Sequence, residues 1–465
     1  MNQLLLTPTD TLFFRDGRPM EGALSGHGAA WPLPTVTNAA LHAALHDAQK
    51  ASLLTGTAHH HDHMLGTERA LKDIRAFGSL TTTGPFPVGP DGAWYYPRPL
   101  DITSGTLEAT LHPHIQTGSS SLPAALCAIM VSDQPPSKNS PAKTWLSKVD
   151  YEAYLAGNKA APKASVNDDD IYLAESSIGI AIDPDTGTTG QGEAQGKIYS
   201  SHSLRMKEGW RLGLLAVTDE KQSNGARRDL IGQDLYSNPN GHVILGGQQR
   251  VCAVRRESVS VVPLPRGKQT GFTVSPAGKH LVKWVLLSPA IFPEITAGIS
   301  KRGTERHAHP GGWLPTWIDP TTSRVLLQTL DADERRRRRQ LNYGGKGYRS
   351  EENASPVAAR LVAARIDKPL PITGWANGDD SLGEASRVGA KSTHLAVPAG
   401  SVYYFACDSA DAAVQLAAAL NWHGGEITGT TIRNRRSTLL GEKGFGLGVC
   451  GTWTPLGMSG SSPVA

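Results

Sequence analysis

The sequence predicts an α+β protein built from two ferredoxin-like (RRM-like) domains with glycine-rich loops and long insertions. Its 465 residues exceed what one hydrophobic core usually supports. Its 50 glycines and 31 prolines indicate many turns and long loops rather than a helical bundle. A strand, a helix, a glycine loop and a further strand close each half, as in a split β-α-β unit with an antiparallel sheet and helices on one face. We therefore expect two such domains, residues 1–262 and 263–465.

The overall composition argues against several classes of protein. The 46 Lys and Arg residues nearly balance the 42 Asp and Glu residues, so bulk charge indicates no nucleic-acid, membrane or acidic partner, and local clusters must carry that argument. We find no N-terminal signal segment and no apolar run near the roughly 18 residues of a membrane span. The four cysteines form no C-x-x-C pair, which indicates neither a zinc knuckle nor a disulfide framework but a reducing cytoplasm: Cys127, Cys252, Cys407 and Cys450.

The first predicted elements are a short buried strand at residues 2–6, a turn and a helix. An Asp-Gly pair supplies the turn and holds Arg15 and Arg18 on an exposed loop beside aromatic residues. This pattern suits contacts to phosphates and bases. Taken alone, it is more typical of an ordinary solvated turn with Arg15 paired to a carboxylate. The residues after Pro34 predict a helix. Its apolar face would consist of Leu41, Ala44, Leu45 and Ala48.

The rest of the first half alternates between weakly and strongly patterned stretches. Residues 86–100 predict a hairpin, whereas residues 103–170 are rich in Ser, Pro, Ala and Lys and predict an insertion with little core of its own. Residues 175–183 and 197–200 alternate like two strands around a glycine-rich loop. We expect these two strands to form a protruding finger.

The end of the first half and the second half share their landmarks. A strand at 242–245 runs into Gly246 and Gly247, with Arg250 directly behind them. In the second half, residues 286–292 echo the first strand and the residues that follow it. Residues 400–405 predict another strand, which is followed by a helix that Ser409 caps and Gly424 and Gly425 stop. Its predicted apolar face consists of Ala413, Leu416, Ala417 and Leu420.

Residues 444–453 alternate glycine with apolar residues and then enter a strand, so this backbone must come very close to something. The neighbour is either a phosphate chain or protein, because glycine also serves bulges and tight packing. A Walker loop has a Lys-Ser/Thr pair after its last glycine, and this stretch has none. The stretch also follows a helix rather than opening one, as a dinucleotide fingerprint would.

Two charged runs each allow two interpretations. The five arginines at 335–339 lie in a basic segment, about 331–352, and must be solvated as an exposed helix face or neutralised by a polyanion. Tyrosines among its glycines could stack on unpaired bases. The run of His and Asp at residues 59–63 has side chains that bind transition metals, but it sits alone between glycines. We interpret it as a mobile polar loop.

Taken in order, these landmarks resemble the third subunit of the Cmr complex, the type III-B CRISPR effector, in the RAMP superfamily. The resembling stretches span almost the whole chain, and their order is far more specific than any one of them. They are residues 11–19, 31–34, 84–86, 97–101, 175–183, 245–247, 287–290, 372–375, 397–405 and 444–446.

The resemblance implies two ferredoxin-like RAMP domains, no catalysis, no cofactor and no metal. It also implies binding of the 5′ repeat-derived handle of the guide RNA (crRNA), beside a large polymerase-like subunit and a backbone subunit, with target RNA bound through the complex. The chain departs from the family pattern at Gln248, where an acidic residue is usual. The segments 103–170 and 331–352 look like lineage-specific insertions.

Because handle nucleotides are single-stranded, we expect cations on phosphates and close backbone contacts to splayed bases. Glycine loops let a sugar-phosphate chain approach main-chain N–H groups, and arginines beside them supply charge-assisted hydrogen bonds. The predicted RNA-binding surface consists of Arg15, Arg18, Ser177, Ile178, Gly179, Tyr199, Arg205, Gly246, Gly247, Arg250, Gly444, Phe445, Gly446 and Gly448.

Two other functions are considered. An endoribonuclease that processes CRISPR precursor RNA shares the superfamily fold and would need a general base near the scissile 2′-hydroxyl. His27 and His42 are the candidates near the N-terminal motifs, and the sequence places no obvious catalytic partner beside either of them. A metal phosphohydrolase built on His61 and Asp62 lacks the remaining ligands.

Overall fold

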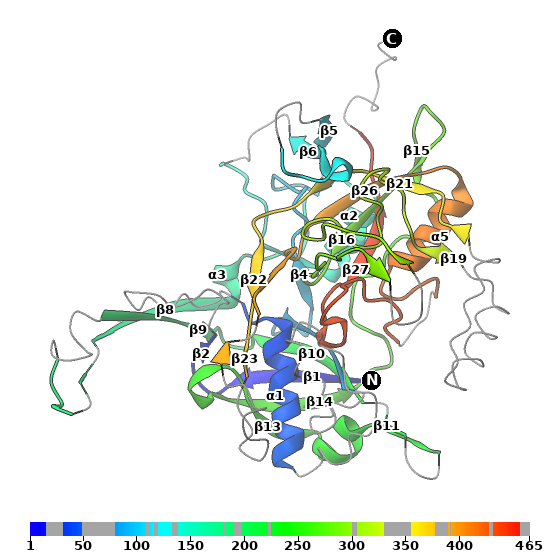
Figure 1. The fold of residues 1–465 in the computed structure, drawn as a ribbon. Helices are drawn as coiled ribbons and strands as arrows, with labels where there is room; N and C mark the ends of the chain where they lie inside the picture. Colours follow the sequence, from blue (N-terminus) through cyan, green and yellow to red (C-terminus); the bar gives the residue numbers. More distant parts are fainter. Residues whose placement is uncertain are drawn as a thin grey trace.

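The computed structural model shows a mixed α/β protein with two main sheets, one below the other in Figure 1. Each sheet is made mainly from one half of the chain. The structure describes residues 1–14, 31–48, 80–107, 111–115, 120–132, 138–180, 182–183, 185–189, 198–218, 220–221, 225–299, 305–329, 355–376, 389–390, 392–426 and 431–455.

The first sheet is antiparallel and has the strand order β13-β14-β1-β10-β3. Numbered in chain order, β1, β3, β10 and β14 lie as 4-1-3-2. Helix α1 (Pro34–Asp47) crosses one face of this sheet and buries Leu41 and Leu45 against it, as predicted (Figure 1). The strands are β1 (Asn2–Pro8), β3 (Thr81–Val88), β10 (Arg211–Val217), β13 (Asn240–Ile244) and β14 (Val251–Ser258).

The predicted closing order of the first half is wrong in one place. Between β10 and the glycines there is no regular α-helix in the described residues, but a five-residue π-helical segment, η6 (Ile231–Leu235), and then β13. Ile231 and Leu230 are buried there and take the place of a helix face. A segment this short has no hydrophobic periodicity that a sequence could display.

The second sheet has the order β15-β16-β26-β21-β6-β5, with β27 paired to the other side of β16 from β26. Its strands β16, β21, β26 and β27 also lie as 4-1-3-2 in chain order. Helix α5 (Ala410–Leu420) packs on it, and the predicted face Ala413, Leu416, Ala417 and Leu420 is fully buried. The strands are β15 (Thr273–Val274), β16 (His280–Leu286), β21 (Ala359–Arg365), β26 (Val402–Cys407) and β27 (Gly448–Thr452).

The predicted start of helix α5 is confirmed, whereas its predicted end is not. The Ser409 side chain accepts a hydrogen bond from the Ala412 N–H at 3.1 Å, which confirms the predicted cap. The helix ends at Leu420 rather than at the glycine pair, because Asn421 turns to extended backbone. The Asn421 side-chain oxygen accepts from the Cys450 N–H at 2.6 Å, so a contact to β27 ends the helix.

Residues 103–170 do not behave as the sequence suggested. Strands β5 (Leu111–Ile115) and β6 (Ala128–Ser132) extend the second sheet, with β6 parallel to β21. Helix α2 (Lys148–Leu155) buries Tyr151 and Tyr154 in a core that both halves share. The predicted hairpin at 86–100 is reduced to one bridge, and β4 (Tyr95–Pro97) pairs instead with β7 (Trp145–Ser147). The core contribution of this segment was missed because its apolar residues are sparse and find their partners far away in the sequence.

A buried ion pair ties this segment to the second sheet. Asp101 is completely buried and accepts hydrogen bonds from the Tyr154 hydroxyl at 2.6 Å and the Tyr404 hydroxyl at 2.9 Å. The Lys283 amine lies 3.5 Å from the same carboxylate and 3.4 Å from the centre of the Tyr154 ring. Burial lowers the pKa of Lys283, while Asp101 acts in the opposite direction. A pair so completely enclosed is stable only because its hydrogen bonds are satisfied.

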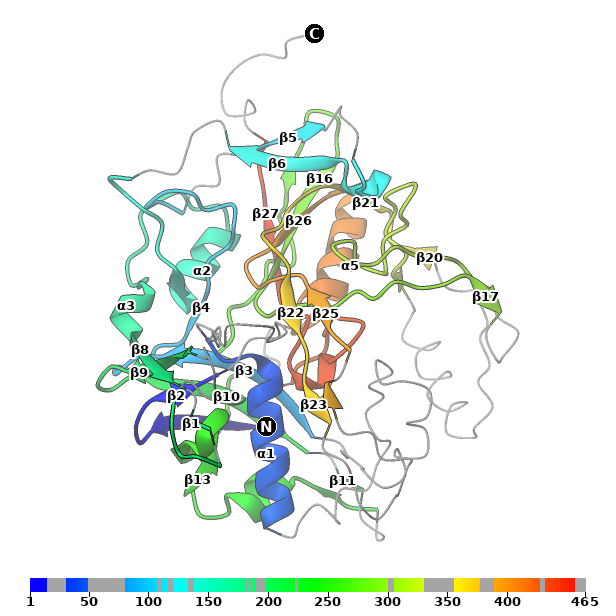
Figure 2. The same ribbon diagram turned by 60° about the vertical axis from the view of Figure 1, so that its left-hand side comes forward.

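The predicted finger is confirmed. Strands β8 (Tyr172–Ile180) and β9 (Ile198–Met206) form one antiparallel ribbon that projects away from the first sheet in Figure 1. In Figure 2 the same ribbon is turned toward the viewer. Its base is anchored where β9 pairs with β2 (Leu12–Phe13). Tyr172 and Leu204 fix that base in the core of the first half.

The remaining elements are short. One α-helix, α3 (Asp168–Ile171), leads into the finger. The others are β11 (Glu220–Lys221) paired with β12 (Arg227–Arg228), β17 (Gly298–Ile299) with β18 (Glu305–Arg306), β19 (Gln328–Thr329) with β20 (Ser355–Pro356), β22 (Leu370–Ile372) with β25 (His394–Ala396), β23 (Trp375–Ala376) with β24 (Gly389–Ala390), and the turns η4 (Ala124–Leu126), η7 (Gly247–Gln249) and η9 (Gly441–Lys443). Among the described residues, no helix is long and apolar enough to cross a membrane.

Candidate nucleic-acid interface

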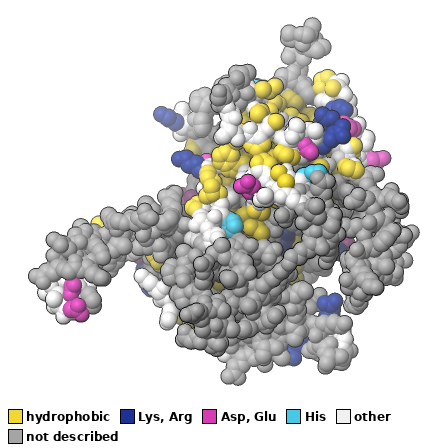
Figure 3. Space-filling model, viewed as in Figure 1, with side chains coloured by type: hydrophobic (Ala, Val, Ile, Leu, Met, Phe, Trp, Pro, Cys, Tyr) yellow, Lys and Arg dark blue, Asp and Glu magenta, His cyan; other side chains and the backbone are white. Residues whose placement is uncertain are grey.

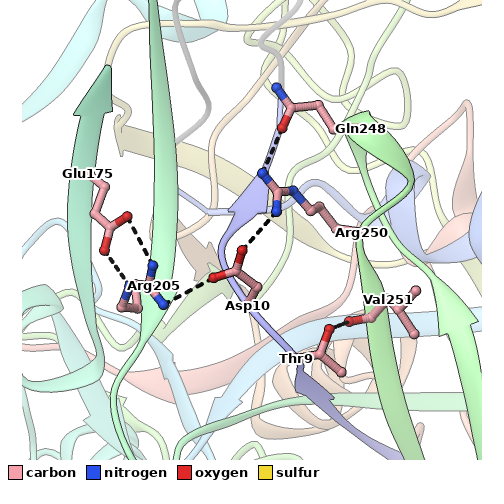
Figure 4. Close-up of polar contacts among 7 residues, drawn as sticks. All are labelled: Thr9, Asp10, Glu175, Arg205, Gln248, Arg250 and Val251. Atoms are coloured by element: carbon pink, nitrogen blue, oxygen red, sulfur yellow. Dashed lines mark hydrogen bonds and ion pairs between the residues drawn. The ribbon is translucent and has the colours of Figure 1, made fainter.

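Two of the predicted RNA-binding arginines meet at the base of the finger. Asp10 lies between them: its Oδ1 is 3.1 Å from Arg205 Nη1 and its Oδ2 is 2.9 Å from Arg250 Nη1 (Figure 4). Glu175 pairs with the other side of the Arg205 guanidinium, and the Gln248 amide oxygen accepts from Arg250 Nη2 at 2.8 Å. We call these five residues the root cluster.

The strand pairing explains why the root cluster forms. Strand β1 pairs with β14. The chain then crosses to the finger, where its next strand, β2, pairs with β9. Thr9 is fixed to β14, because its N–H and its hydroxyl both donate to the Val251 carbonyl, at 3.1 and 2.9 Å. Asp10 is therefore held in the gap between the start of β14 and the end of β9, where Arg250 and Arg205 stand.

Charge in the root cluster is balanced and accessible to solvent. The side chains of Asp10, Arg205 and Glu175 are 50%, 46% and 44% exposed, and that of Arg250 is 31% exposed. The Thr11 N–H and then the two guanidiniums hold the pKa of Asp10 below its usual value. Glu175, followed by Asp10, raises the pKa of Arg205. Two carboxylates and two guanidiniums face one another here, so the formal charges of the cluster sum to zero.

The glycines beside Arg250 are partly accessible, but the close approach they permit is to protein. A Cβ on Gly246 would lie 2.6 Å from the Phe13 carbonyl oxygen, and one on Gly247 would lie 2.7 Å from the Phe13 ring. The next two residues, Gln248 and Gln249, adopt left-handed backbone with φ of 59° and 51°. Such conformations are costly for residues with a side chain. The loop therefore presents Arg250 from a strained turn fixed on Phe13.

The second predicted glycine stretch is not part of any surface, which corrects the sequence-based expectation. Gly444, Gly446 and Gly448 are buried, and Phe445 is completely enclosed. A Cβ on Gly446 would lie 1.9 Å from the Ser437 nitrogen, and one on Gly448 would lie 2.2 Å from Trp284 Nε1. The neighbour that these glycines accommodate is protein. Tight packing, the second interpretation of the stretch, is what the structure shows.

The finger residues divide between two faces. Alternation along β8 and β9 puts Ser177, Gly179 and the backbone position of Tyr199 on the same face as Arg205. The Ser177 hydroxyl is 2.7 Å from that of Ser201 there. Ile178 lies on the opposite face, where its side chain is 78% exposed. The structure thus brings Ser177 and Gly179 into line with the root cluster and directs Ile178 away from it.

Several sequence-based candidates lie outside the described residues. These are Arg15, Arg18, His27, the His and Asp run at 59–63, and the arginines at 335–339. His42 is half-buried on α1. Within the described part of the chain, no group of three or more His, Cys, Asp or Glu side chains is arranged to hold a metal ion.

A groove of about 1230 Å³ opens beside the root cluster. It lies between α1, the loop at Gly246 and the strands β22 and β25 of the second half. Its walls are largely apolar and include Ala39, Ala43, Gly247 and Ile372. In the space-filling view of Figure 3, the described Lys and Arg side chains form scattered small groups on the visible face, in keeping with the balanced composition.

Sequence reasoning missed Asp10, which holds the root cluster together. It follows a strand with no turn, metal or phosphate motif around it. Its two partners are 195 and 240 residues away along the chain. Only the pairing of β1 with β14 and of β2 with β9 reveals them.

The sequence profile of the CRISPR-associated protein family Cas_Cmr3 matches residues 4–453, nearly the whole chain. The chain belongs to this family. The match confirms the resemblance inferred from the order of the sequence landmarks. No curated protein matches the sequence significantly.

Solved structures of related assemblies contain similar chains. One is the type III-B Cmr-beta complex bound to cognate target RNA, with 14% identity, a TM-score of 0.36 and coverage of 86% of each chain. Another is the Csm3-Csm4 subcomplex of the type III-A interference complex, with 10% identity, a TM-score of 0.30 and coverage of 87% of this chain and 92% of that one. The Csm1-Csm4 cassette with AMPPNP gives 11% identity, a TM-score of 0.29 and coverage of 65% and 83%. At these scores, only the family match carries the identification.

Proposed function

We propose that this chain is a non-catalytic RNA-binding subunit of a type III-B CRISPR effector complex, in which it holds the 5′ handle of the crRNA. In this role it joins the large polymerase-like subunit to the backbone subunit in cytoplasmic defence against foreign RNA and DNA, and meets target RNA through the complex. The observation that carries the proposal is the root cluster: in a Cas_Cmr3 chain, two arginines stand together beside an accessible glycine loop.

We also propose that the chain is a duplication of two ferredoxin-like RAMP domains, residues 1–262 and 263–465. The support is that both main sheets have the strand order 4-1-3-2 and that a glycine stretch precedes the fourth strand of each. The segment 103–170 is then an insertion of the first domain that packs on the second. The basic segment 331–352 is a second insertion.

The proposed RNA path uses what the geometry offers. Guanidiniums bind phosphate oxygens through directed, charge-assisted hydrogen bonds. The hydroxyl-lined face of the finger, with Ser177 and Ser201, offers hydrogen bonds to sugars and bases on the same side as Arg205. Gly246 and Gly247 leave backbone groups uncovered between Arg250 and the neighbouring groove. A single strand crossing the base of the finger would contact all three.

Replacing either arginine tests the proposal. With Arg250→Gln or Arg205→Gln, we expect the affinity of the whole protein for a labelled handle RNA to fall roughly fivefold, since these side chains are partly exposed and already paired. The matched control is Arg255→Gln on the same strand β14, which removes an exposed ion-paired arginine 3.2 Å from Glu257. Equal affinities for all three variants and the parent protein would show that RNA does not bind at the root cluster.

The same assay examines catalysis. We expect the handle RNA to stay intact with and without divalent metal, because the described residues contain no group of three or more His, Cys, Asp or Glu side chains that could hold a metal ion. Cleavage by the pure protein that disappears in His27→Ala or His42→Ala would assign an endoribonuclease instead.

A further inference from the structure

The Asp10 carboxylate has the contacts that a phosphate would make. Each of its oxygens accepts from a different guanidinium, Oδ1 from Arg205 at 3.1 Å and Oδ2 from Arg250 at 2.9 Å (Figure 4). A phosphodiester group also carries two charged, unsubstituted oxygens, and guanidinium N–H groups bind both anions in the same way. The space between the two guanidiniums therefore accommodates one anionic group.

This contact is easily broken. Ion pairs between exposed side chains contribute little to stability. Asp10 and Arg205 are each close to half exposed. Arg205 stays in place without Asp10, because Glu175 holds its Nε and Nη2. Arg250 stays in place through Gln248. The two guanidiniums are thus positioned independently of the carboxylate between them.

Building on the proposed function, we propose that Asp10 occupies, in the free chain, the position that one phosphate of the bound RNA takes. The phosphate displaces the carboxylate, and the two guanidiniums exchange one anion for another. Asp10 is then an internal competitor, and it lowers the affinity of the site for every RNA that places a phosphate there. No bond is made or broken beyond hydrogen bonds.

Removing the charge of Asp10 tests the proposal. Asp10→Asn keeps a hydrogen-bond acceptor of the same shape but leaves the root cluster with one net positive charge. For the whole protein, we expect handle RNA and an unrelated single-stranded RNA to bind roughly three- to tenfold more tightly at about 50 mM salt, with a salt slope steeper by about 0.7. Gln248→Glu places a second carboxylate beside Arg250 and should weaken the binding of both RNAs.

The matched control is Asp408→Asn, which removes an exposed carboxylate paired with Lys279 on the second sheet. It should change neither RNA affinity nor salt slope. A double-mutant cycle supplies the second readout: in an Arg205→Gln, Arg250→Gln background, Asp10→Asn should no longer tighten binding, because the competed positions are gone. A structural role for Asp10 would not produce this coupling.

The outcomes separate the two proposals. If the arginine variants weaken RNA binding but Asp10→Asn weakens it too or leaves it unchanged, then Asp10 positions the arginines and does not compete with phosphate. If the arginine variants bind RNA like the parent protein, the site itself is misplaced and the proposed function fails at this location. Tighter binding that persists in the double-arginine background would reduce Asp10 to a general surface charge and also overturn the inference.

Discussion

At the scale of single residues, the buried glycine stretch gives the sharpest prediction. Gly446 has φ +73° and its Cβ would overlap the Ser437 nitrogen, whereas Gly278 has φ +75° and open space around it. Gly278→Ala should cost about 1 kcal/mol of unfolding free energy for the left-handed backbone alone, and Gly446→Ala at least about 2 kcal/mol more for the overlap. Urea unfolding of both variants measures the difference. Equal losses would mean that the stretch is less tightly packed than the structure shows.

Residues also show where sequence reasoning ended. The alternation at 444–453 correctly indicated a close approach, but glycine does not reveal what approaches it, and here Ser437 and Trp284 do. The structure places Arg205 at the base of the finger and Arg250 directly after the glycines, as expected, and their binding of RNA stays a prediction. Their joint partner Asp10 could not be, because nothing in the local sequence links positions separated by 195 and 240 residues.

At the scale of elements, helix α2 depends on one carboxylate. Asp150 is 2% exposed and accepts from the Lys163 N–H at 2.8 Å, the Ala164 N–H at 2.9 Å and the Ser165 hydroxyl at 2.7 Å. Asp150→Asn should lower the unfolding free energy by about 1–3 kcal/mol, since an amide cannot accept all of these bonds. Asp169→Asn, an exposed carboxylate on α3, is the control.

The pH dependence of this loss has a definite sign. Burial raises the pKa of Asp150, but its hydrogen bonds outweigh burial and bring the pKa below the ordinary 3.8. A lowered pKa gives stability that is present above 3.8 and is lost as the pH falls through the folded-state value. The difference between the parent protein and Asp150→Asn should therefore shrink below about pH 3.8, as thermal unfolding at several pH values can show. A difference that grew on acidification would contradict the assigned hydrogen bonds.

Elements with local signals were predicted well, and the others were not. Helix α5, with its Ser409 cap and buried face, and the ribbon β8–β9 both follow from short-range periodicity. The hairpin of β5 and β6 could not be placed in the second sheet, because β21, the partner of β6, lies more than 200 residues later and no periodicity encodes that pairing.

At the scale of the whole molecule, the two halves share one core, so we expect them to unfold together. Tyr96, Tyr151 and Tyr154 from the first half pack with Val285, Tyr404 and Trp422 from the second. Urea unfolding followed by far-UV circular dichroism and by tryptophan fluorescence should give coincident transitions. Lys283→Met leaves Asp101 buried without its cation. It should lower the unfolding free energy by about 3–5 kcal/mol as measured by both probes. Two separated transitions would mean that the sheets are energetically independent.

The pairing of β6 with β21 also sets an order of events during synthesis. The first sheet is complete once Ser258 has left the ribosome, so it can form while the second half is still being made. The hairpin β5–β6 is made earlier still, yet its partner strand β21 is synthesised only at residues 359–365. Helix α2 is likewise made long before β27, which covers one of its faces and lies near the end of the chain. During that interval an unpaired strand edge and two tyrosines remain uncovered on the nascent chain. Slow or interrupted translation between residues 132 and 359 should therefore expose the chain to chaperones and to aggregation through this edge.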